Sequence, residues 1–493
     1  PFMVSSSLSG YFKILDLSQP DDPVPTNDAL MLKVVKKINA FRANLNAQQQ
    51  GNISAAVTAP VMLNGGTPDG IIQGCPLTPP IPASDSCSNW HYRLPKISSD
   101  LKSKTGEGVT VFVLDAFPER GIIERAVRDA GDDNVLLRNV YETVSFDYSL
   151  LSGVQEAGAL RGMEDGFVGK DVYGRHYPIL MADHGLYIAG IVRDVARKAD
   201  IECIRVLNGF CAGDMNVLSN ALTNIYNRKI GAAEPSLEGK PVVINMSLVF
   251  PTDDELMSSG VDPASGGFGT IRAAIFLQIK ALTDLGVVVV ASAGNEGDER
   301  EMNMTGAMGR PDALYPAQFC YAPYNDDNII PVGAVDAGGS ATHYSCYPGP
   351  RGVATYGGNV PSVSPASPPS VNPTVDTSDM PHGLYASVEY PPLSADPPEQ
   401  YYAAPDDHAW AYWVGTSFAT PIVAAVAARV LQSSPTLAGT GVHDAILSEA
   451  VDTVQWTNLS GNVVQQPGSM LLAVQECRRT DYEEGDEDDE DEE

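Results

Sequence analysis

The chain has 493 residues, 43% of them hydrophobic, which is enough for one large α/β domain with additional segments. Its formal net charge of −31 argues against nucleic-acid binding, because neutralising phosphates requires clustered Lys and Arg. No uninterrupted apolar run is long enough to span a bilayer, so we expect no membrane span.

The first 88 residues differ in pattern from the rest of the chain. Residues 28–50 place apolar side chains near helical spacing, with Asn27 or Asp28 as the candidate N-cap. The Gly-, Pro- and Ser-rich stretch that follows, to about Ser88, is typical of a loop. We therefore separate residues 1–88 from the domain that begins near residue 89.

From there, strand and helix patterns alternate, which predicts a mostly parallel sheet with helices on both faces. A β-branched run over 109–114 predicts a buried strand that ends at Asp115. His184 opens an apolar helical run to 192, and Asn295 closes a strand-like run that begins at 286. Further helices are expected over 119–130, 216–228, 268–285 and 442–451, and further strands over 200–206, 242–246 and 471–474.

Two stretches interrupt this alternation. Residues 141–177 are expected to be an insertion or an elaborated loop before His184. Residues 354–408 are rich in Pro, Ser and Tyr and are too long for a core connection, so we interpret them as an insertion. Surface decoration is the favoured role for this second insertion, and shaping of substrate access or a partner site is the alternative.

Ser417 lies where small residues give way to the apolar helical run 422–428. A serine before a helix is usually an N-cap, and its hydroxyl is a weak nucleophile without an activating histidine, an orienting acid and an oxyanion donor. Asp115, His184 and Asn295 supply those residue types at strand ends or a helix start, where α/β sheets bind their ligands. His176 and His343 are the alternative bases, but neither stands in a motif.

The motifs around these residues are similar to those of one protein family. They are GTSFATP at 415–421, HGLYIAG at 184–190, VVVVASAGNEG at 287–297 and VVINMSLVF at 242–250. Asp115, His184, Asn295 and Ser417 follow one another in the order that the family has, and over about residues 89–474 the chain resembles the subtilisin-like serine proteases, or subtilases. The resemblance implies a three-layer fold with a mostly parallel central sheet and helices on both faces. It also implies a catalytic domain over 89–476, and a peptide or protein substrate.

The resemblance assigns a role to each candidate residue. Ser417 would be the nucleophile, His184 the base, Asp115 the acid that orients it, and Asn295 the oxyanion donor, assisted by Thr416. Two segments would line the pocket for the residue before the cleaved bond and pair with an extended peptide by strand addition. These pocket residues are Ser247, Leu248, Val249, Ala291, Ser292, Ala293 and Gly294.

The chain also departs from the family pattern. Ala116 and Phe117 stand where the family prefers a small hydroxyl residue and Gly, and Leu186-Tyr187 replace Thr-His after the histidine. Val249 replaces a Gly in the pocket strand. We therefore keep two functions open: an endopeptidase, which we favour, and a catalytically weak or inactive subtilase-fold binding or scaffold protein. A hydrolase of the nucleophile-elbow type is a poor third, because Ser417 lacks the GxSxG pattern.

The sequence also gives expectations about cofactors, cysteines and the two ends of the chain. No Cys/His spacing resembles a zinc site, and no catalytic cofactor is expected; a structural calcium stays open without assigned ligands. Among seven cysteines, Cys75 and Cys87 are candidates for a local disulfide, and Cys203 for a buried thiol. By resemblance, residues 1–88 are a propeptide or an arm on the catalytic domain, and the protein is exported, with a cytoplasmic location as the alternative. The acidic tail over 477–493 is predicted to be disordered.

Overall fold

The computed structural model describes most of the chain from residue 89 to residue 477. Within that span the described part omits 151–167, 171–175, 179–181, 208, 210–211, 249–267, 296–328, 350, 361, 365–373, 388–407, 438, 451 and 457–467. Of the first 88 residues it describes 2–4, 10–12, 60–62, 80–83 and 87. The helix expected over 28–50, residue Cys75 and the acidic tail after residue 477 lie outside the described residues.

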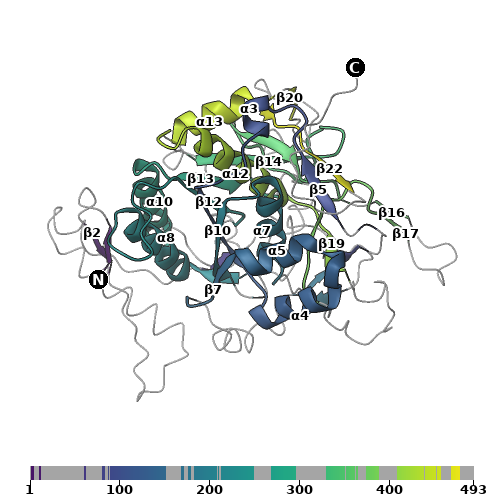
Figure 1. Cartoon of the computed structure of the whole chain (residues 1–493), viewed down its shortest axis with the longest axis horizontal. Coiled ribbons are helices and arrows are strands. Elements are labelled where there is room, and N and C mark those ends of the chain that lie inside the picture. The colour runs from purple at the N-terminus through teal and green to yellow at the C-terminus, as the bar shows by residue number, and fades with distance from the viewer. Residues whose placement is uncertain are drawn as a thin grey trace, which may run out of the picture.

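An 11-stranded sheet forms the centre of the molecule (Figure 1). Its middle strands are parallel and run in the order β15, β14, β13, β12, β6, β10, and most of their residues are buried. Parallel strands covered on both faces need nearly continuous apolar sequences, which is the pattern that these segments carry. The bounds are β6 (Thr110–Ala116), β10 (Asp200–Leu207), β12 (Val242–Met246), β13 (Val288–Ser292), β14 (Ile329–Val335) and β15 (Val353–Tyr356).

Helices cover both faces of this sheet, so the expected three-layer α/β fold is confirmed. On one face α7 (His184–Val195) packs against β6, and α12 (Thr416–Ser433) packs against β12, β13 and β14. These two helices also pack closely against each other. On the other side of the sheet in Figure 1, α8 (Met215–Lys229) packs against α10 (Phe268–Asp284). The helices expected over 216–228 and 268–285 match α8 and α10 to within one residue at each end, and α7 extends three residues beyond the expected run 184–192.

The remaining described elements are short or lie at the edges of the sheet. They are β1 (Phe2–Val4), β2 (Gly10–Phe12), β3 (Pro60–Met62), β4 (Ile81–Pro82), β5 (Trp90–Arg93), α3 (Ser99–Lys102), α4 (Arg120–Ala130), η1 (Gly131–Asp133), α5 (Val135–Thr143), β7 (Ser145–Asp147), β8 (Val168–Lys170), β9 (His176–Pro178), β11 (Ala212–Asp214), β16 (Ser362–Ser364), β17 (Thr374–Asp376), β18 (His382–Leu384), β19 (Trp410–Tyr412), α13 (Gly439–Ser448), β20 (Asp452–Val454), β21 (Gly468–Met470) and β22 (Val474–Cys477).

Three sequence predictions need correction. The stretch 354–408 is not wholly an insertion, because 354–356 belong to the core strand β15 and β18 is buried. The stretch 141–177 begins inside α5 and contributes β7, which pairs in parallel with β10. The strand expected over 471–474 is wrong, since residues 471–473 separate β21 from β22. In each case pairing with distant strands decided the structure, and local composition carries no signal of such partners.

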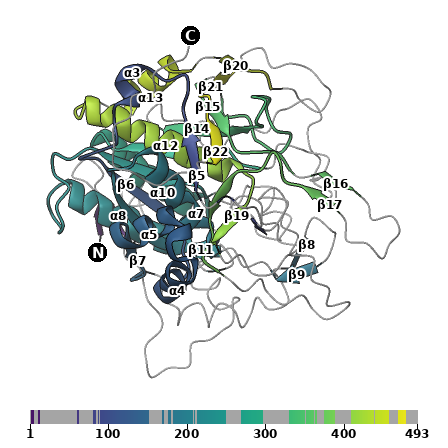
Figure 2. The same ribbon diagram turned by 45° about the vertical axis from the view of Figure 1, so that its right-hand side comes forward.

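Two segments that are far apart in sequence meet in the fold. β5 and β22 pair antiparallel, side by side in Figure 2, and a disulfide joins Cys87 to Cys477 next to them. The expectation of a Cys75–Cys87 disulfide is therefore wrong, because residues far apart in sequence are adjacent in the fold. Cys203 is a buried free thiol, as expected. From the N-terminal region, β3 pairs with β11 at the sheet edge and β4 pairs with β19.

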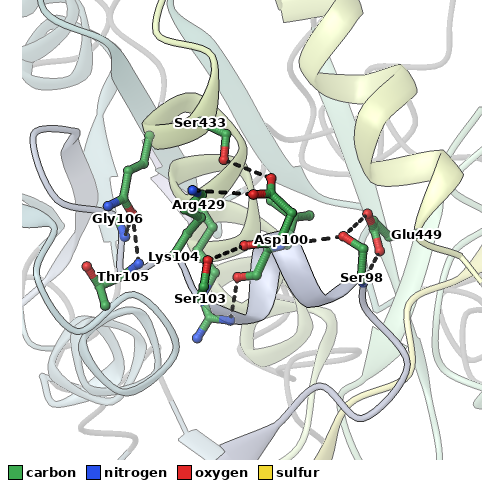
Figure 3. Close-up of polar contacts among 11 residues, drawn as sticks. Ser98, Asp100, Ser103, Lys104, Thr105, Gly106, Arg429, Ser433 and Glu449 are labelled. Carbon is green, nitrogen blue, oxygen red and sulfur yellow. Dashed lines mark hydrogen bonds and ion pairs between the residues drawn. The ribbon is translucent and has the colours of Figure 1, made fainter. Parts of the chain in front are cut away.

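The C-terminal end of α12 is held by polar contacts (Figure 3). Arg429 donates from Nε to the carbonyl of Val195, the last residue of α7, at 2.8 Å, and from Nη1 to the carbonyl of Leu101 at 3.3 Å. Ser433 Oγ donates to Asp100 Oδ2 at 3.3 Å. These bonds tie the far ends of α7 and α12 together, so the relative position of their first residues is constrained.

Candidate active site

Asp115 and His184 form a buried pair at the strand ends. Asp115 lies near the end of β6 and His184 is the first residue of α7; both side chains are 0% exposed. His184 Nδ1 donates to Asp115 Oδ1 at 2.8 Å, and the N–H of Ala116 donates to the same oxygen at 2.7 Å. Because the carboxylate requires a donor, this bond assigns the proton to Nδ1 and leaves Nε2 as the acceptor.

The other oxygen of this carboxylate receives no hydrogen bond from the part of the chain that the structure describes. Among the described residues nothing hydrogen-bonds Asp115 Oδ2, which is buried. A hydroxyl side chain at position 116, directly after Asp115, could supply such a bond, and the methyl group of Ala116 cannot. Burial therefore raises the pKa of Asp115 above its ordinary value, although the charge of His184 and the bonds from His184 and Ala116 act in the opposite direction.

Ser417 is the second residue of α12. The turn before it needs Gly415, whose φ of 155° is a conformation that side-chain-bearing residues rarely adopt. Ser247 Oγ donates to the carbonyl of Ser417 at 3.0 Å, and Asn245 Nδ2 donates to Ser247 Oγ at 3.1 Å. The backbone of Ser417 is thus held to the end of β12.

Ser417 Oγ and the second ring nitrogen of His184 use none of their hydrogen-bonding capacity within the described residues. Ser417 Oγ and His184 Nε2 are both buried, and neither has a hydrogen-bond partner among the described residues. They do not bond to each other in this conformation. The ring centroid of Phe418, the residue after Ser417, lies 5.3 Å from that of His184.

Asn295 follows β13 and reaches the start of α12. Its Oδ1 accepts hydrogen bonds from the N–H of Thr416 at 2.9 Å and from Thr416 Oγ1 at 2.8 Å. Its Nδ2 is buried and has no partner among the described residues. An ideal Cβ on Gly415 would lie 3.5 Å from this nitrogen, so the amide donor faces the turn before Ser417. Thr416 therefore orients Asn295.

Aromatic side chains surround the imidazole. Trp413 and Phe418 each place a ring centroid 5.3 Å from that of His184, and Tyr187 lies 4.3 Å from Phe418. Phe117 also packs here: a Cβ on Gly185 would come within 2.6 Å of its ring and 2.4 Å of a backbone oxygen. Sequence reasoning noted Phe117 and Tyr187 only as departures, and it missed Trp413 because packing around a site leaves no motif.

Comparison with known proteins decides the family. A model of the subtilase family matches residues 179–466, which is more than half of the chain. The chain belongs to the subtilase family. Subtilases are serine peptidases, so membership assigns the chain to that class of hydrolase.

Individual relatives of this subtilase are distant. Subtilisin DY of Bacillus licheniformis is 24% identical over 281 residues, which cover 57% of this chain and 75% of that protein. Subtilisin of Bacillus pumilus is 24% identical over 269 residues, covering 55% and 70%. A solved structure of proteases from Pseudoalteromonas arctica is 19% identical, covers 77% of this chain and 91% of that chain, and has a TM-score of 0.43.

The two expected pocket segments of this subtilase do not both offer a free strand edge. Ala291 pairs with Met246 on one side and Pro331 on the other, and Ser292 is paired with Val332. The N–H of Ala293 donates to the carbonyl of Val332 at 2.8 Å. Both strand edges of Ala291 are therefore occupied, whereas Ser292 and Ala293 have these partners on the β14 side, and strand addition of a peptide to the pocket segments stays a prediction.

The other pocket residues have mixed outcomes. Leu248 is fully buried, and Ser247 is turned toward the Ser417 carbonyl. The carbonyl of Gly294 accepts from the N–H of Cys346 at 2.9 Å. Val249 lies outside the described residues. His343, an alternative base, is exposed and stacks edgewise on Tyr344, and the side chain of His176 is not described.

The described residues contain neither a cluster of metal ligands nor a helix that could span a membrane. No three His, Cys, Asp or Glu side chains gather there in the manner of a metal site, so a structural calcium stays an untested expectation. Within the same residues, every helix is too short or too polar to cross a membrane.

Proposed function

We propose that this subtilase is a serine endopeptidase. Ser417 Oγ attacks the scissile carbonyl, His184 Nε2 takes the hydroxyl proton and returns it to the leaving amine, and Asp115 stabilises the imidazolium. The observation that carries the proposal is the buried 2.8 Å bond between His184 Nδ1 and Asp115 Oδ1. It holds the ring in the one tautomer that can accept a proton from serine.

The tetrahedral intermediate requires donors for its oxygen. Asn295 Nδ2 is a buried donor without a partner among the described residues, and it faces the turn before Ser417. The N–H groups of the first helical turn have no partner within the helix, and the helix dipole favours negative charge there. Asn295 and the N–H of Ser417 together are the proposed oxyanion hole.

One observation favours the second candidate function, an inactive binding or scaffold protein. Ser417 and His184 are both 0% exposed, and they do not hydrogen-bond to each other. Reaction therefore needs local rearrangement that admits a substrate and brings Oγ to Nε2. We favour the peptidase because apo sites often tighten only when substrate binds.

A serine-reactive fluorophosphonate probe separates the two functions. The peptidase predicts labelling of the folded protein that disappears in Ser417→Ala and in His184→Ala. The scaffold predicts that the folded wild-type protein stays unlabelled and leaves an unfolded protein substrate uncut. Asp444→Ala, a change at an exposed site on α13, is the matched control and should label as the wild type does.

The substrate, the N-terminal region and the location follow as further proposals. We propose a peptide or protein substrate, without a catalytic cofactor. The pairing of β3 with the sheet edge at β11 supports a role for residues 1–88 as an arm or propeptide on the catalytic domain. Mass spectrometry of the chain ends, with and without Ser417→Ala, tests self-processing. The Cys87–Cys477 disulfide supports an extracytoplasmic location, since disulfides persist in oxidising compartments.

A further inference from the structure

The segment 380–387, which contains β18, lies across the helix that begins with His184. Tyr187 Oη donates to the carbonyl of Pro381 at 2.5 Å. A Cβ on Gly383 would come within 2.3 Å of the Tyr187 ring, and a Cβ on Gly190 within 2.9 Å of Leu384. Such close approach shows that the segment and α7 are packed without space between them.

One end of this segment is held independently of α7. The N–H of His382 donates to Gln475 Oε1 at 2.7 Å, and Gln475 Nε2 donates back to the carbonyl of His382 at 2.7 Å. The His382 ring stacks on Trp90 with centroids 3.5 Å apart. The N–H of Tyr385 donates to the carbonyl of Ala409 at 2.9 Å. β18 is therefore anchored to its neighbouring strands.

The other end is held by Asp183, the residue directly before His184. Its carboxylate accepts hydrogen bonds from the N–H of Ala386 at 2.6 Å, from the N–H of Ser387 at 3.2 Å, and from Ser387 Oγ. The side chain makes no capping bond to its own helix, although it occupies the N-cap position of α7. Its three bonds therefore connect the start of α7 to the anchored segment.

Because Asp183 is buried, the position of its carboxylate depends on these hydrogen bonds. Asp183 is 1% exposed, and a buried carboxylate is costly unless donors surround it. If the donors were lost, the carboxylate would move toward water and the first turn of α7 would move with it. The next residue is His184, and a displacement of about 1 Å in a catalytic group can cost roughly 100-fold in rate.

We propose that Asp183 is a positioning residue of the peptidase site, holding the start of α7, and with it the His184 ring, against residues 386–387. The proposal rests on the proposed peptidase function. It also accounts for the buried part of the stretch 354–408, which from its composition looked like surface decoration.

The test compares alanine substitutions of two aspartates, one at each end of α7. Asp183→Ala should slow fluorophosphonate labelling roughly 10- to 100-fold, and Asp183→Asn, which keeps an acceptor for the N–H of Ala386, should restore most of that loss. Asp194→Ala is the matched control: Asp194 is a buried carboxylate near the end of α7, bonded to His91 at 2.7 Å. It should lower thermal stability and leave the labelling rate of the folded fraction within a few-fold of wild type.

Equal slowing by Asp194→Ala, or unchanged labelling of folded Asp183→Ala, would overturn the proposal. If Asp183→Ala does not fold, Ser387→Ala decides: it removes one donor, and we expect a several-fold slower rate, whereas an unchanged rate counts against Asp183. If the wild type does not label at all, the peptidase function fails separately. The low-field proton NMR signal of the His184 Nδ1–H then serves as the readout. It should shift in Ser387→Ala and stay in place in Asp194→Ala, and no shift in Ser387→Ala refutes the positioning role.

Discussion

The side-chain oxygen of Asn295 accepts two hydrogen bonds from Thr416, one from its N–H and one from its hydroxyl. A carboxamide whose oxygen is held in this way has a defined orientation, and its nitrogen must face the opposite direction. That nitrogen is the buried donor beside the turn that leads to Ser417. The residue before the nucleophile therefore orients the proposed oxyanion donor.

Removing this donor should lower the rate of the chemical step. We expect Asn295→Ala to reduce kcat by roughly 10²–10³ with little change in KM, because the bond forms only in the transition state. Thr416→Val keeps the side-chain volume and the hydrogen bond from the backbone N–H to Asn295, but it removes the bond from the hydroxyl. Its reduction of kcat should therefore be smaller than that of Asn295→Ala. Steady-state kinetics on a peptide substrate measures both. A loss that appears in KM alone would contradict the assignment.

The carboxylate of Asp115 should respond to a new donor at residue 116. Asp115 must be ionised to stabilise the imidazolium, and its pKa is raised mainly by burial. Ala116→Ser offers a hydroxyl to the carboxylate and should lower that pKa, which a pH titration of the Asp115 carboxyl carbon followed by NMR measures. Ala116→Gly, which adds no donor, is the control. The same Asp115 pKa in wild type and Ala116→Ser would count against this interpretation.

Asp183 should make stability depend on pH in a particular direction. Burial raises the pKa of Asp183 to about 6, from an ordinary value of 3.8. Between pH 3.8 and pH 6 the folded state therefore holds a proton that the unfolded state has lost. The contribution of Asp183 to the free energy of unfolding is fully present below pH 3.8, and it disappears as the pH rises through 6. Over this pH range the free energy of unfolding should fall by about 3 kcal/mol because of this group. Chemical denaturation of wild type and Asp183→Asn between pH 3.5 and pH 7 measures it, and a constant difference in unfolding free energy would contradict it.

The disulfide between Cys87 and Cys477 should stabilise the fold. The two residues are 390 positions apart, so the bond restricts the unfolded chain over most of its length. We expect the double variant Cys87→Ser/Cys477→Ser to lose about 2–4 kcal/mol of unfolding free energy. Wild type with reductant should behave in the same way, and adding reductant to the double variant should change nothing further. Equal stability of oxidised wild type and the double variant would show that the bond is not stabilising.

The sequence alone predicted the fold class and most of the core elements. Buried parallel strands and buried helices need long apolar runs, so β12, α7 and α12 were found close to their observed limits. It also named Asp115, His184, Asn295 and Ser417, because they lie at strand ends or a helix start in the order that the family has, and the last three stand in motifs.

Tertiary structure decided the relationships between distant residues. The partner of Cys87, the two paired edges of Ala291, and the burial of β18 over α7 depend on segments that lie far apart in the chain. The same is true of Asp183, whose neighbours in sequence do not indicate that its carboxylate binds residues 386–387. Local patterns report how a segment buries its own apolar side chains. Which donor meets which buried acceptor is settled only when the sheet and its helices have packed.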